Sequence, residues 1–425
     1  MTFDVVRLGD IMSMRKDTWN PTTENAQKVA HFSLPAFDSG AFELASPSSI
    51  QSNKTRFYGD AILLSKLNPG TPRIWLVREC LEVPMVASGE FLVLQPSDEI
   101  SLDFMYLLLK TPNLRIKMVE LTTGTSNSHQ RFRPEDFLNL EVGVLRGEAN
   151  RTSVSTFLLS LEEKIRLNTE LSRTLEAIAQ TMFKSWFVDF DPVHAKMRGE
   201  KPEGMEDAMA ALFPDSFEES EVGLIPSGWG VTTLGVVCQT VLGGTPSRKK
   251  DEYWGGEIPW VNSGAVNHFR ITKASEYITS VGLAKSATKL MPRGTTVIAI
   301  TGATLGQFSR LEIDACANQS VVGVLGNEML SNEYLYLQIA ANIGELVSMQ
   351  TGGAQQHINK DNVNSLRIVV PSKELLEKFQ VLAGPLFKEV GNLALQSETL
   401  KEARDSLLPR LISGELQIPD EMQTS

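Results

Sequence analysis

Cysteine is scarce in this chain of 425 residues. The three cysteines, Cys80, Cys238 and Cys316, lie too far apart to clip one metal ion locally and are too few for a framework of disulfides. Long apolar runs are also missing. No stretch approaches the roughly 18 residues of a membrane span, and the first residues lack the basic and apolar regions of a secretory signal. These absences favour a cytoplasmic protein.

Sequence motifs of catalysis and metal binding are absent as well. The chain has no Gly-x4-Gly-Lys-Ser/Thr phosphate loop, no His-Glu-x-x-His or paired Cys-His zinc spacing, and no Gly-x-Ser-x-Gly nucleophile elbow. The stretch 302–306 is interpreted as a tight turn, because no Lys-Ser or Lys-Thr follows it. We expect each of the scattered histidines to hydrogen-bond in a turn or in the core: His31, His129, His194, His268 and His357. The sequence therefore predicts no catalytic residue and no metal site.

Positive charge is in deficit, since 40 Lys and Arg residues against 51 Asp and Glu residues give a net charge of -11. Over the whole chain, this balance argues against a nucleic-acid partner. The acidic residues are concentrated in the segment 191–230, however, which has a net charge of -6. Between Arg248 and Arg310, nine basic residues stand against four acidic ones, so this segment is suited to meet phosphate.

A long internal repeat is the most informative feature of the sequence, because its two halves match at an offset of about 226 residues. Four matches occur in the same order in both halves. They are Val6–Gly9 with Thr232–Gly235, Phe104 and Tyr106 with Tyr334 and Tyr336, the turns Thr123-Gly124 and Thr351-Gly352 with His129 and His357 after them, and the strands 140–144 and 366–370. Equivalent histidines after a turn favour a shared structural or contact role. We expect two similar globular parts.

Each half ends in a long helix with a coiled-coil pattern. Between Leu158 and Trp186, apolar and small residues are spaced alternately three and four apart, and the same pattern returns 225 residues later. One such helix alone would pack on its own globular part, but two matched patterns favour an antiparallel pair. The residues expected in the helix–helix seam are Leu158, Leu161, Ile165, Leu175, Met182, Trp186, Leu386, Val390, Leu393, Leu400, Leu407 and Leu411.

Five segments are predicted along the chain. They are a globular part over 1–150, a helix over 151–190, an acidic connector over 191–227, a second globular part over 228–371 and a second helix over 372–414. The globular parts alternate short Val, Ile and Leu runs with Gly, Pro and Asn turns, which is typical of strands. The expected fold class is α+β: two mixed α/β domains separated by two long antiparallel helices that form a coiled coil, in an internal pseudo-two-fold repeat.

Characteristic stretches surround the connector and recur through both globular parts. Around the connector they are WFVDFDPVHAK (186–196) and LFPDSFEESEVGLIPSGW (212–229). In the second half they are GGTPSRKKDEYWGGEIPWVNSG (243–264), TGGAQQHI (351–358) and RDSLLPRLISGEL (404–416), and in the first HFSLPAFDSG (31–40) and LLSKLNPGTPRIWLV (63–77). Together they resemble the specificity (S) subunit of type I restriction-modification systems. The first globular part departs from the GGTPS opening of the second, so we expect the two to read different sequences.

The resemblance implies a function and a set of partners. Such subunits carry two target recognition domains, each reading one half of a bipartite, asymmetric site in double-stranded DNA, and two antiparallel helices that set the unread spacer. The helices also dock two modification (methyltransferase) subunits, which bind S-adenosylmethionine and methylate adenine. Restriction/translocase subunits that use ATP and Mg²⁺ join the complex for cleavage in host defence against foreign DNA. The chain itself is expected to bind no cofactor and to do no chemistry.

Two alternatives stay open beside this interpretation. One is an enzyme, a nuclease or methyltransferase, whose motif is not evident in the sequence. The other is a scaffold that uses its helical seams for protein assembly and binds no DNA.

Contacts to bases and phosphates are expected from polar and basic residues on turns. Arginine pairs with guanine and asparagine with adenine through two hydrogen bonds, whereas lysine more often positions the phosphate backbone. The candidates in the first part are Asn53, Lys54, Lys66, Asn68, Arg73, Arg131 and Arg133. Those in the second are Arg248, Lys249, Lys250, Arg270, Lys273, Lys285, Lys289 and Arg293. Trp75, Trp254 and Trp260 are expected in the core rather than at the DNA face.

Overall fold

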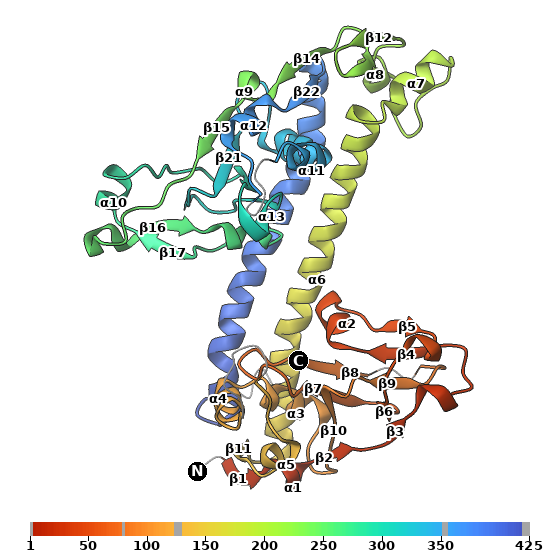
Figure 1. Cartoon of the computed structure of the whole chain (residues 1–425), viewed down its shortest axis with the longest axis vertical. Coiled ribbons are helices and arrows are strands. Elements are labelled where there is room, and N and C mark those ends of the chain that lie inside the picture. Colours follow the sequence, from red (N-terminus) through yellow and green to blue (C-terminus); the bar gives the residue numbers. More distant parts are fainter. Residues whose placement is uncertain (1–2, 79–80, 123–129, 351–355, 419–425) are drawn as a thin grey trace. The chain divides into compact units, whose positions relative to one another are not determined.

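The structure, a computed structural model of the chain, describes residues 3–78, 81–122, 130–350 and 356–418. It contains two compact units: residues 1–164 with 400–425, and residues 165–399. The two longest helices described have 40 residues each: α6 (Glu148–Phe187) and α13 (Lys373–Ile412) (Figure 1). One end of each helix belongs to the first unit and the other end to the second. In the described part of the chain, no helix combines the length and apolarity needed to cross a membrane.

Strands form two main sheets and one ribbon in the first unit. The four-stranded sheet β2-β10-β7-β8 is antiparallel and consists of Met12–Arg15, Phe91–Pro96, Ala61–Ser65 and Ile74–Val77. The five-stranded sheet β3-β6-β9-β4-β5, in which β4 and β9 pair in parallel, consists of Thr18–Trp19, Lys54–Phe57, Met85–Ala87, Val29–Phe32 and Glu43–Ala45. The ribbon pairs β1 (Phe3–Arg7) with β11 (Glu141–Leu145). The helices are α1 (Leu8–Ile11), α2 (Leu34–Ser39), α3 (Leu102–Leu109), α4 (Pro112–Glu120), α5 (Pro134–Leu138) and the 3-10 turns η1 (Pro21–Thr23) and η2 (Pro47–Ser49).

The central strand β7 shows why this unit has a core on both sides of its four-stranded sheet. All five of its residues are buried. Ile62 and Leu64 belong to a cluster that includes α3, whereas Ala61 and Leu63 belong to another with Phe32. Successive side chains of a strand point to opposite faces, so a continuous apolar run is what a strand covered on both faces requires.

The second unit repeats part of this plan. Its four-stranded antiparallel sheet, β15-β21-β18-β19, consists of Gln239–Leu242, Val321–Leu325, Thr296–Ala299 and Phe308–Arg310. A three-stranded sheet, β17-β16-β20, consists of Glu276–Ile278, Trp254–Val261 and Cys316–Ala317. The ribbons are β14–β22 (Gly230–Thr233, Arg367–Val370) and β12–β13 (Phe217–Ser220, Gly223–Pro226). The helices are α7 (Asp191–Met197), α8 (Asp207–Ala210), α9 (Leu234–Val237), α10 (Ser280–Ala284), α11 (Asn332–Ser348), α12 (Lys360–Ser365) and the 3-10 turns η3 (Asp251–Tyr253), η4 (Ser263–Asn267) and η5 (Gly302–Thr304).

The internal repeat of the sequence is a repeat of structure, which confirms the expectation of two α+β parts. In each half the opening strand pairs with the strand just before the long helix, β1 with β11 and β14 with β22. The one-turn helices α1 and α9 follow these strands, and the four-stranded sheets have the same antiparallel order. The expected turn at 302–306 contains η5, between β18 and β19. Other repeat residues, together with Cys80, lie outside the described residues: Thr123, Gly124, His129, Thr351 and Gly352.

Helices α6 and α13 pair in antiparallel fashion inside both units. In the first unit, Leu158 near the start of α6 shares a buried cluster with Leu408 and Leu411 near the end of α13. In the second, the ring of Phe183 near the end of α6 lies 5.9 Å from that of Phe379 near the start of α13. All twelve residues expected in the seam are buried or partly buried. Both helices also enter the cores of the globular parts, so pairing and packing on the domains occur together.

Polar residues interrupt the seam at a point within the second unit. Asn168 is 2% exposed and donates from Nδ2 to Oε1 of Gln396 on α13, over 2.8 Å. Ser172 on α6 and Ser397 on α13 are also buried. Because a polar pair in an apolar seam fits one alignment of two helices, these residues fix the register of the pair.

The substitution Leu158→Ala tests the packing of the helix pair. It is expected to lower the free energy of unfolding by about 2–5 kcal/mol, because it empties a fully buried position in the cluster shared by α3, α6 and α13. Urea unfolding followed by circular dichroism measures this change. Leu167→Ala, on the same helix at a side chain 46% exposed, is the matched control and is expected to cost less than about 1 kcal/mol. Equal costs for the two substitutions would contradict the packing described.

Candidate nucleic-acid interface

Four candidate residues of the first unit gather at the turn between β7 and β8: Lys66, Asn68, Arg73 and Arg131. The main chain holds the turn in place. The N–H of Lys66 donates to the carbonyl of Glu90 over 2.9 Å, and the N–H of Asn68 donates to the carbonyl of Gln130 over 3.0 Å. Asn68 has a φ of 54°, in the left-handed region that asparagine tolerates better than most residues. The segment that carries Arg131 is therefore fixed against this turn.

Both arginines at this turn are already paired with carboxylates. Arg73 donates from Nε and Nη2 to the two carboxylate oxygens of Asp38, over 2.7 and 2.8 Å. Arg131 donates from Nη2 to Oε1 of Glu90 over 3.0 Å. The hydrogen bonds between Arg73 and Asp38 lower the pKa of the carboxyl and raise the pKa of the guanidinium. A contact of this kind has the two-pronged geometry by which arginine binds phosphate or guanine, so a nucleic acid has to displace the carboxylate.

The other three candidates of the first unit stand at or just before the start of β6 and α5. Asn53 is exposed just before β6. Lys54 begins β6 and donates from Nζ to the carbonyl and hydroxyl oxygens of Ser52, over 3.0 and 2.7 Å, and desolvation lowers its pKa. Arg133 is exposed and precedes α5. Since β6 belongs to the five-stranded sheet, Asn53 and Lys54 stand on a different sheet from the β7–β8 turn.

The candidates of the second unit divide into two groups. The first group is exposed, at turns around the three-stranded sheet and α10: Arg248, Lys249, Lys250, Lys285 and Lys289. The guanidinium of Arg248 lies 3.6 Å from the ring centre of Trp254 and donates to both carboxylate oxygens of Glu276, over 2.5 and 2.7 Å. These hydrogen bonds raise the pKa of Arg248 and lower that of Glu276. Basic turns with an aromatic platform suit a nucleic-acid backbone.

Two glycines bring these basic turns together. A Cβ on Gly243 would stand 2.1 Å from the carbonyl oxygen of Asn318, and one on Gly244 would stand 2.7 Å from the amide nitrogen of Thr288. Both contacts are with backbone, so no larger residue fits without displacing it. The segment that leads to Arg248 therefore lies against residues 285–289, which carry two of the candidate lysines.

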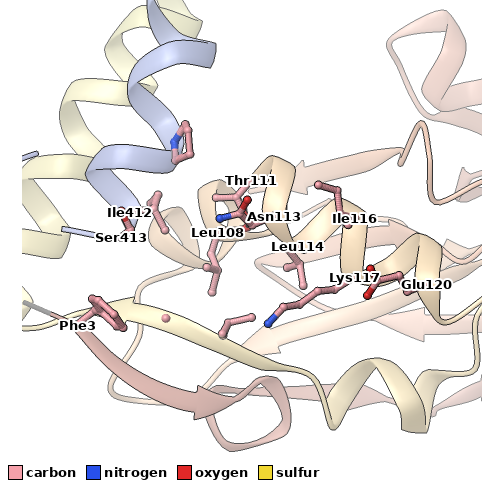
Figure 2. Close-up of a pocket in the computed structure, with 13 residues that line it drawn as sticks. Phe3, Leu108, Thr111, Asn113, Leu114, Ile116, Lys117, Glu120, Ile412 and Ser413 are labelled. Atoms are coloured by element: carbon pink, nitrogen blue, oxygen red, sulfur yellow. The ribbon is translucent and has the colours of Figure 1, made fainter. Parts of the chain in front are cut away.

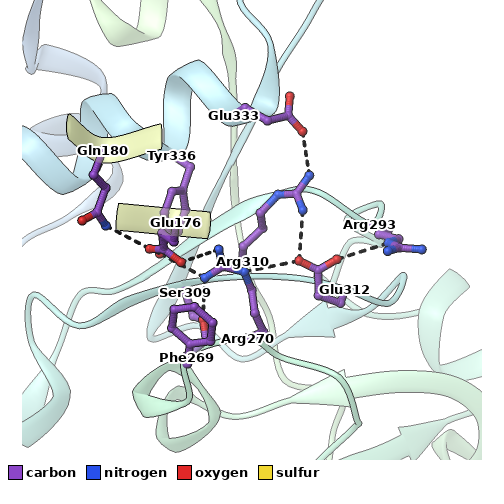
Figure 3. A network of polar contacts seen from close by, with 10 residues as sticks. All are labelled: Glu176, Gln180, Phe269, Arg270, Arg293, Ser309, Arg310, Glu312, Glu333 and Tyr336. Atoms are coloured by element: carbon purple, nitrogen blue, oxygen red, sulfur yellow. Dashed lines mark hydrogen bonds and ion pairs between the residues drawn. The ribbon is translucent and has the colours of Figure 1, made fainter. Parts of the chain in front are cut away.

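The second group lies against the long helices: Arg270, Lys273 and Arg293. Arg270 has a side chain only 1% exposed, and its Nη2 donates to Oε2 of Glu176 on α6 over 2.6 Å (Figure 3). Arg293 donates from Nε to Oε2 of Glu312 over 3.2 Å, and Lys273 forms an ion pair with Glu398 of α13. Arg270 therefore has a structural role rather than the DNA contact expected from the sequence, because no solvent-facing surface is left to it.

A signal for this role was present in the sequence. Glu176 follows the seam residue Leu175, and a charged residue that is buried beside a seam requires a partner of opposite charge. The pattern does not say which of the many basic residues that partner is.

The three tryptophans have different surroundings. Trp260 is buried, and Trp75 packs edge-on against Phe32 with ring centres 5.0 Å apart, so both lie in cores as expected. Trp254 is partly exposed and stacks under Arg248. Its ring also packs against the core cluster of Trp260 and Ile278, so it joins that core, as expected, to the basic turns.

Side chains suited to metal binding or thiol chemistry do not gather within the described ranges. No three His, Cys, Asp or Glu side chains there stand close enough to hold a metal ion. Desolvation raises the pKa of the Cys238 thiol to about 12, and burial also raises the pKa of Cys316. Both thiols are therefore protonated at neutral pH and are poor nucleophiles.

A cavity of about 440 Å³ opens in the first unit, where α4 lies near the β1–β11 ribbon and the end of α13. Its lining is largely apolar and includes Leu108, Leu114 and Ile412 (Figure 2). Lys117 also lines it, but its Nζ donates to the carbonyl of Glu141 over 2.5 Å. The rest of its polar lining consists of Thr111, Asn113, Glu120 and Ser413.

The chain is similar in sequence to a known protein family and to several known proteins. Residues 226–401 match the family described as the type I restriction modification DNA specificity domain. The chain is 28% identical, over 86% of its length and 88% of the relative's, to the type I restriction enzyme HindI specificity subunit of Haemophilus influenzae. It is 23% identical, over 79% of its length and 74% of the relative's, to the type I restriction enzyme MjaIX specificity subunit of Methanocaldococcus jannaschii.

The fold is also similar to that of a solved protein. The crystal structure of the type I restriction-modification system S subunit from M. genitalium matches with a TM-score of 0.58 at 13% sequence identity. The match covers 97% of this chain and 96% of that one. The α+β architecture with two long helices is therefore shared with that protein.

The substitution Glu276→Gln tests whether the ion pair with Glu276 weakens DNA binding by Arg248. It is expected to strengthen binding of a random-sequence DNA duplex about two- to fivefold, because Arg248 no longer has to leave an ion pair. Fluorescence anisotropy with the purified chain measures this. Glu200→Gln, which removes the same charge from the Arg198 pair in the connector, is the matched control and is expected to have little effect. An equal gain in both variants would mean that only net charge matters.

Proposed function

We propose that this chain, which is similar in sequence to type I restriction enzyme specificity subunits, supplies DNA sequence specificity to a complex of this kind. Each globular part reads one half of a bipartite site in double-stranded DNA. The observation that carries this proposal is the duplication: two similar α+β parts, each with basic turns, are built on the same two antiparallel helices. Two readers on one scaffold imply a site in two halves.

The two half-sites differ in this proposal, so the whole site is asymmetric. The four-stranded sheets of the two parts share their strand order, but a five-stranded sheet in one corresponds to a three-stranded sheet in the other. The basic residues also stand on different elements: the β7–β8 turn in the first part, and turns near β16 and α10 in the second. Unlike contact surfaces read unlike sequences.

Two methyltransferase subunits dock on the long helices, and restriction/translocase subunits join them. In support, α6 carries apolar residues that its own seam does not bury: Leu167, Leu171 and Ile178 are 46%, 46% and 51% exposed. Their spacing of four and seven residues places them on one side of the helix. An amphipathic helix of a methyltransferase subunit would cover this stripe.

Catalysis belongs to these partners. The methyltransferase subunits bind S-adenosylmethionine and methylate adenine, the restriction subunits use ATP and Mg²⁺, and this chain binds no cofactor. Its net charge of -11 and the pairing of Arg73, Arg131 and Arg248 with carboxylates give the isolated chain little attraction for DNA. The positive field that steers DNA to the complex then comes from the methyltransferase subunits.

Mapping of methylated adenines tests the proposed function. Genomes of cells that express the methyltransferase partners, with and without this chain, are compared. We expect methylation at one bipartite, asymmetric motif, and its loss when the chain is absent. Methylation that does not depend on the chain would favour the scaffold alternative, and methylation or cleavage of DNA by the purified chain alone would favour an enzyme. Either result would refute the proposal.

Insertion of one heptad into each long helix tests whether the helices set the spacer. Insertions next to Asn168 in α6 and Gln396 in α13 keep the two seams matched, because these two side chains are hydrogen-bonded to each other across the antiparallel pair. A heptad adds about 10 Å at 1.5 Å per residue, or up to about three base pairs of DNA. We expect a longer spacer in the methylated motif. Insertion into one helix alone is the control and is expected to abolish methylation; an unchanged spacer in the doubly extended chain would reject the idea.

A further inference from the structure

Six charged side chains form a network in the second unit, apart from the basic turns described above: Glu176, Arg270, Arg293, Arg310, Glu312 and Glu333. All are largely buried except Arg293, whose side chain is 44% exposed at the edge of the network. Three positive charges balance three negative ones. The side chain of Glu312 is 0% exposed, and those of Arg270 and Arg310 are 1% and 8% exposed. Figure 3 shows these residues converging from α6, from α11, from the end of β19 and from loops of the globular part. We refer to this set as the ion-pair network.

Glu176 joins the network to α6. Its Oε2 accepts a hydrogen bond from Nη2 of Arg270 over 2.6 Å, and its Oε1 accepts one from the hydroxyl of Tyr336 on α11 over 2.8 Å. The side chain of Gln180, one turn further along α6, donates to the same Oε1 over 3.0 Å. Both carboxylate oxygens are thus held by directional bonds, and one residue of α6 ties two separate elements of the globular part to the helix.

Gly391 brings α13 against the same network. A Cβ at this position would stand 2.4 Å from Oε2 of Glu312 and 2.9 Å from Nη2 of Arg293. Glu312 has little freedom to move away, because Arg310 and Arg293 donate to its two oxygens over 3.0 and 3.2 Å. Only a residue without a side chain allows this approach. The network therefore lies against both long helices.

A buried ion-pair network constrains the orientation of the elements that it joins more than it stabilises the fold. Apolar side chains of similar size often stabilise a protein as well as a buried ion pair does, whereas removal of one partner leaves an uncompensated charge in the interior. Apolar surfaces tolerate small slides and rotations, because the hydrophobic effect has no direction. Charge-assisted hydrogen bonds have a preferred geometry, so they do not tolerate such slides and rotations. The network therefore selects one orientation of the globular part on α6 and α13.

We propose that Glu176, Arg270 and Gly391 are positioning residues that fix the angle of the second recognition domain on the helix pair and so set the register between the two DNA half-sites. This inference rests on the proposed function. None of the three residues contacts DNA in this role. They act through the domain, whose basic turns at Arg248 and Lys285 meet the half-site.

The experiment measures discrimination between spacer lengths. The complex of the chain with its methyltransferase subunits is given DNA duplexes in which the half-sites stand at the natural spacing, or one or two base pairs nearer or farther. The ratio of methylation at the natural spacing to that at the others is expected to fall about tenfold or more in Glu176→Gln and in Gly391→Ala. Gly344→Ala, on α11, is the matched control: its Cβ meets nothing within 4 Å, and the ratio is expected to stay unchanged.

A double variant separates positioning from stability. In Glu176→Met with Arg270→Met, no unpaired charge is left and the remaining two arginines balance the remaining two glutamates. Its thermal midpoint is expected to return to that of the unaltered chain, while the spacing ratio stays low, because methionine packs without direction. If the contact between Glu176 and Arg270 served stability alone, the double variant would recover both the thermal midpoint and the spacing ratio.

Each outcome decides between roles. Loss of methylation in equal proportion at every spacing, or a normal spacing ratio in the folded double variant, would overturn the inference and leave the proposed function intact. If Glu176→Gln does not fold, Gly391→Ala and the double variant still give the ratio, which does not depend on the active fraction. If the unaltered complex shows no dependence on spacing at all, the proposed function fails and this inference fails with it.

Discussion

The pairing of α6 with α13 is the interaction on which both halves of this protein depend. Each unit completes its core with a helix end that belongs to the other half of the sequence: Leu408 and Leu411 enter the first unit, and Phe183 and Trp186 enter the second. A sheet with one apolar face has to bury that face against another layer. Neither globular part therefore has its full core without the helix of the other half of the sequence.

Polar contacts that are buried or partly buried attach both halves to α6 in a similar way. In the second unit the hydroxyl of Tyr336 donates to Glu176 of α6 over 2.8 Å; in the first, the hydroxyl of the equivalent Tyr106 donates to Glu162 of α6 over 3.3 Å. A basic residue, Arg270 or Lys110, accompanies each pair. Each globular part is thus attached to α6 through a tyrosine, a glutamate and a cation. The contact in the second unit is the more extensive, since it continues into the ion-pair network.

The arginines of the basic turns are held in a different way, by exposed carboxylates. Arg73 with Asp38 and Arg248 with Glu276 form two-pronged contacts at the surface, where solvent screens the attraction. Such pairs keep a guanidinium oriented for an acceptor of the same shape, while they offer little free positive charge to DNA of any sequence. In the function proposed here, the paired cations of this acidic chain leave the steering of DNA to the partner subunits.

The sequence by itself determined the repeat, the two long helices and their antiparallel seam. These features are periodic, so the spacing of similar residues along the chain is enough to predict them. It also predicted that Lys66, Asn68, Arg73 and Arg131 belong to turns, but not that they meet at one of them. Only the tertiary structure decided which cations remain at the surface. Arg270 differs from Arg248 in its burial because Glu176 stands 94 positions earlier in the chain and meets it only after folding. A contact between residues so far apart produces no periodic pattern in the sequence. The chemistry of a residue can therefore be predicted from its neighbours in the chain, whereas its partner cannot.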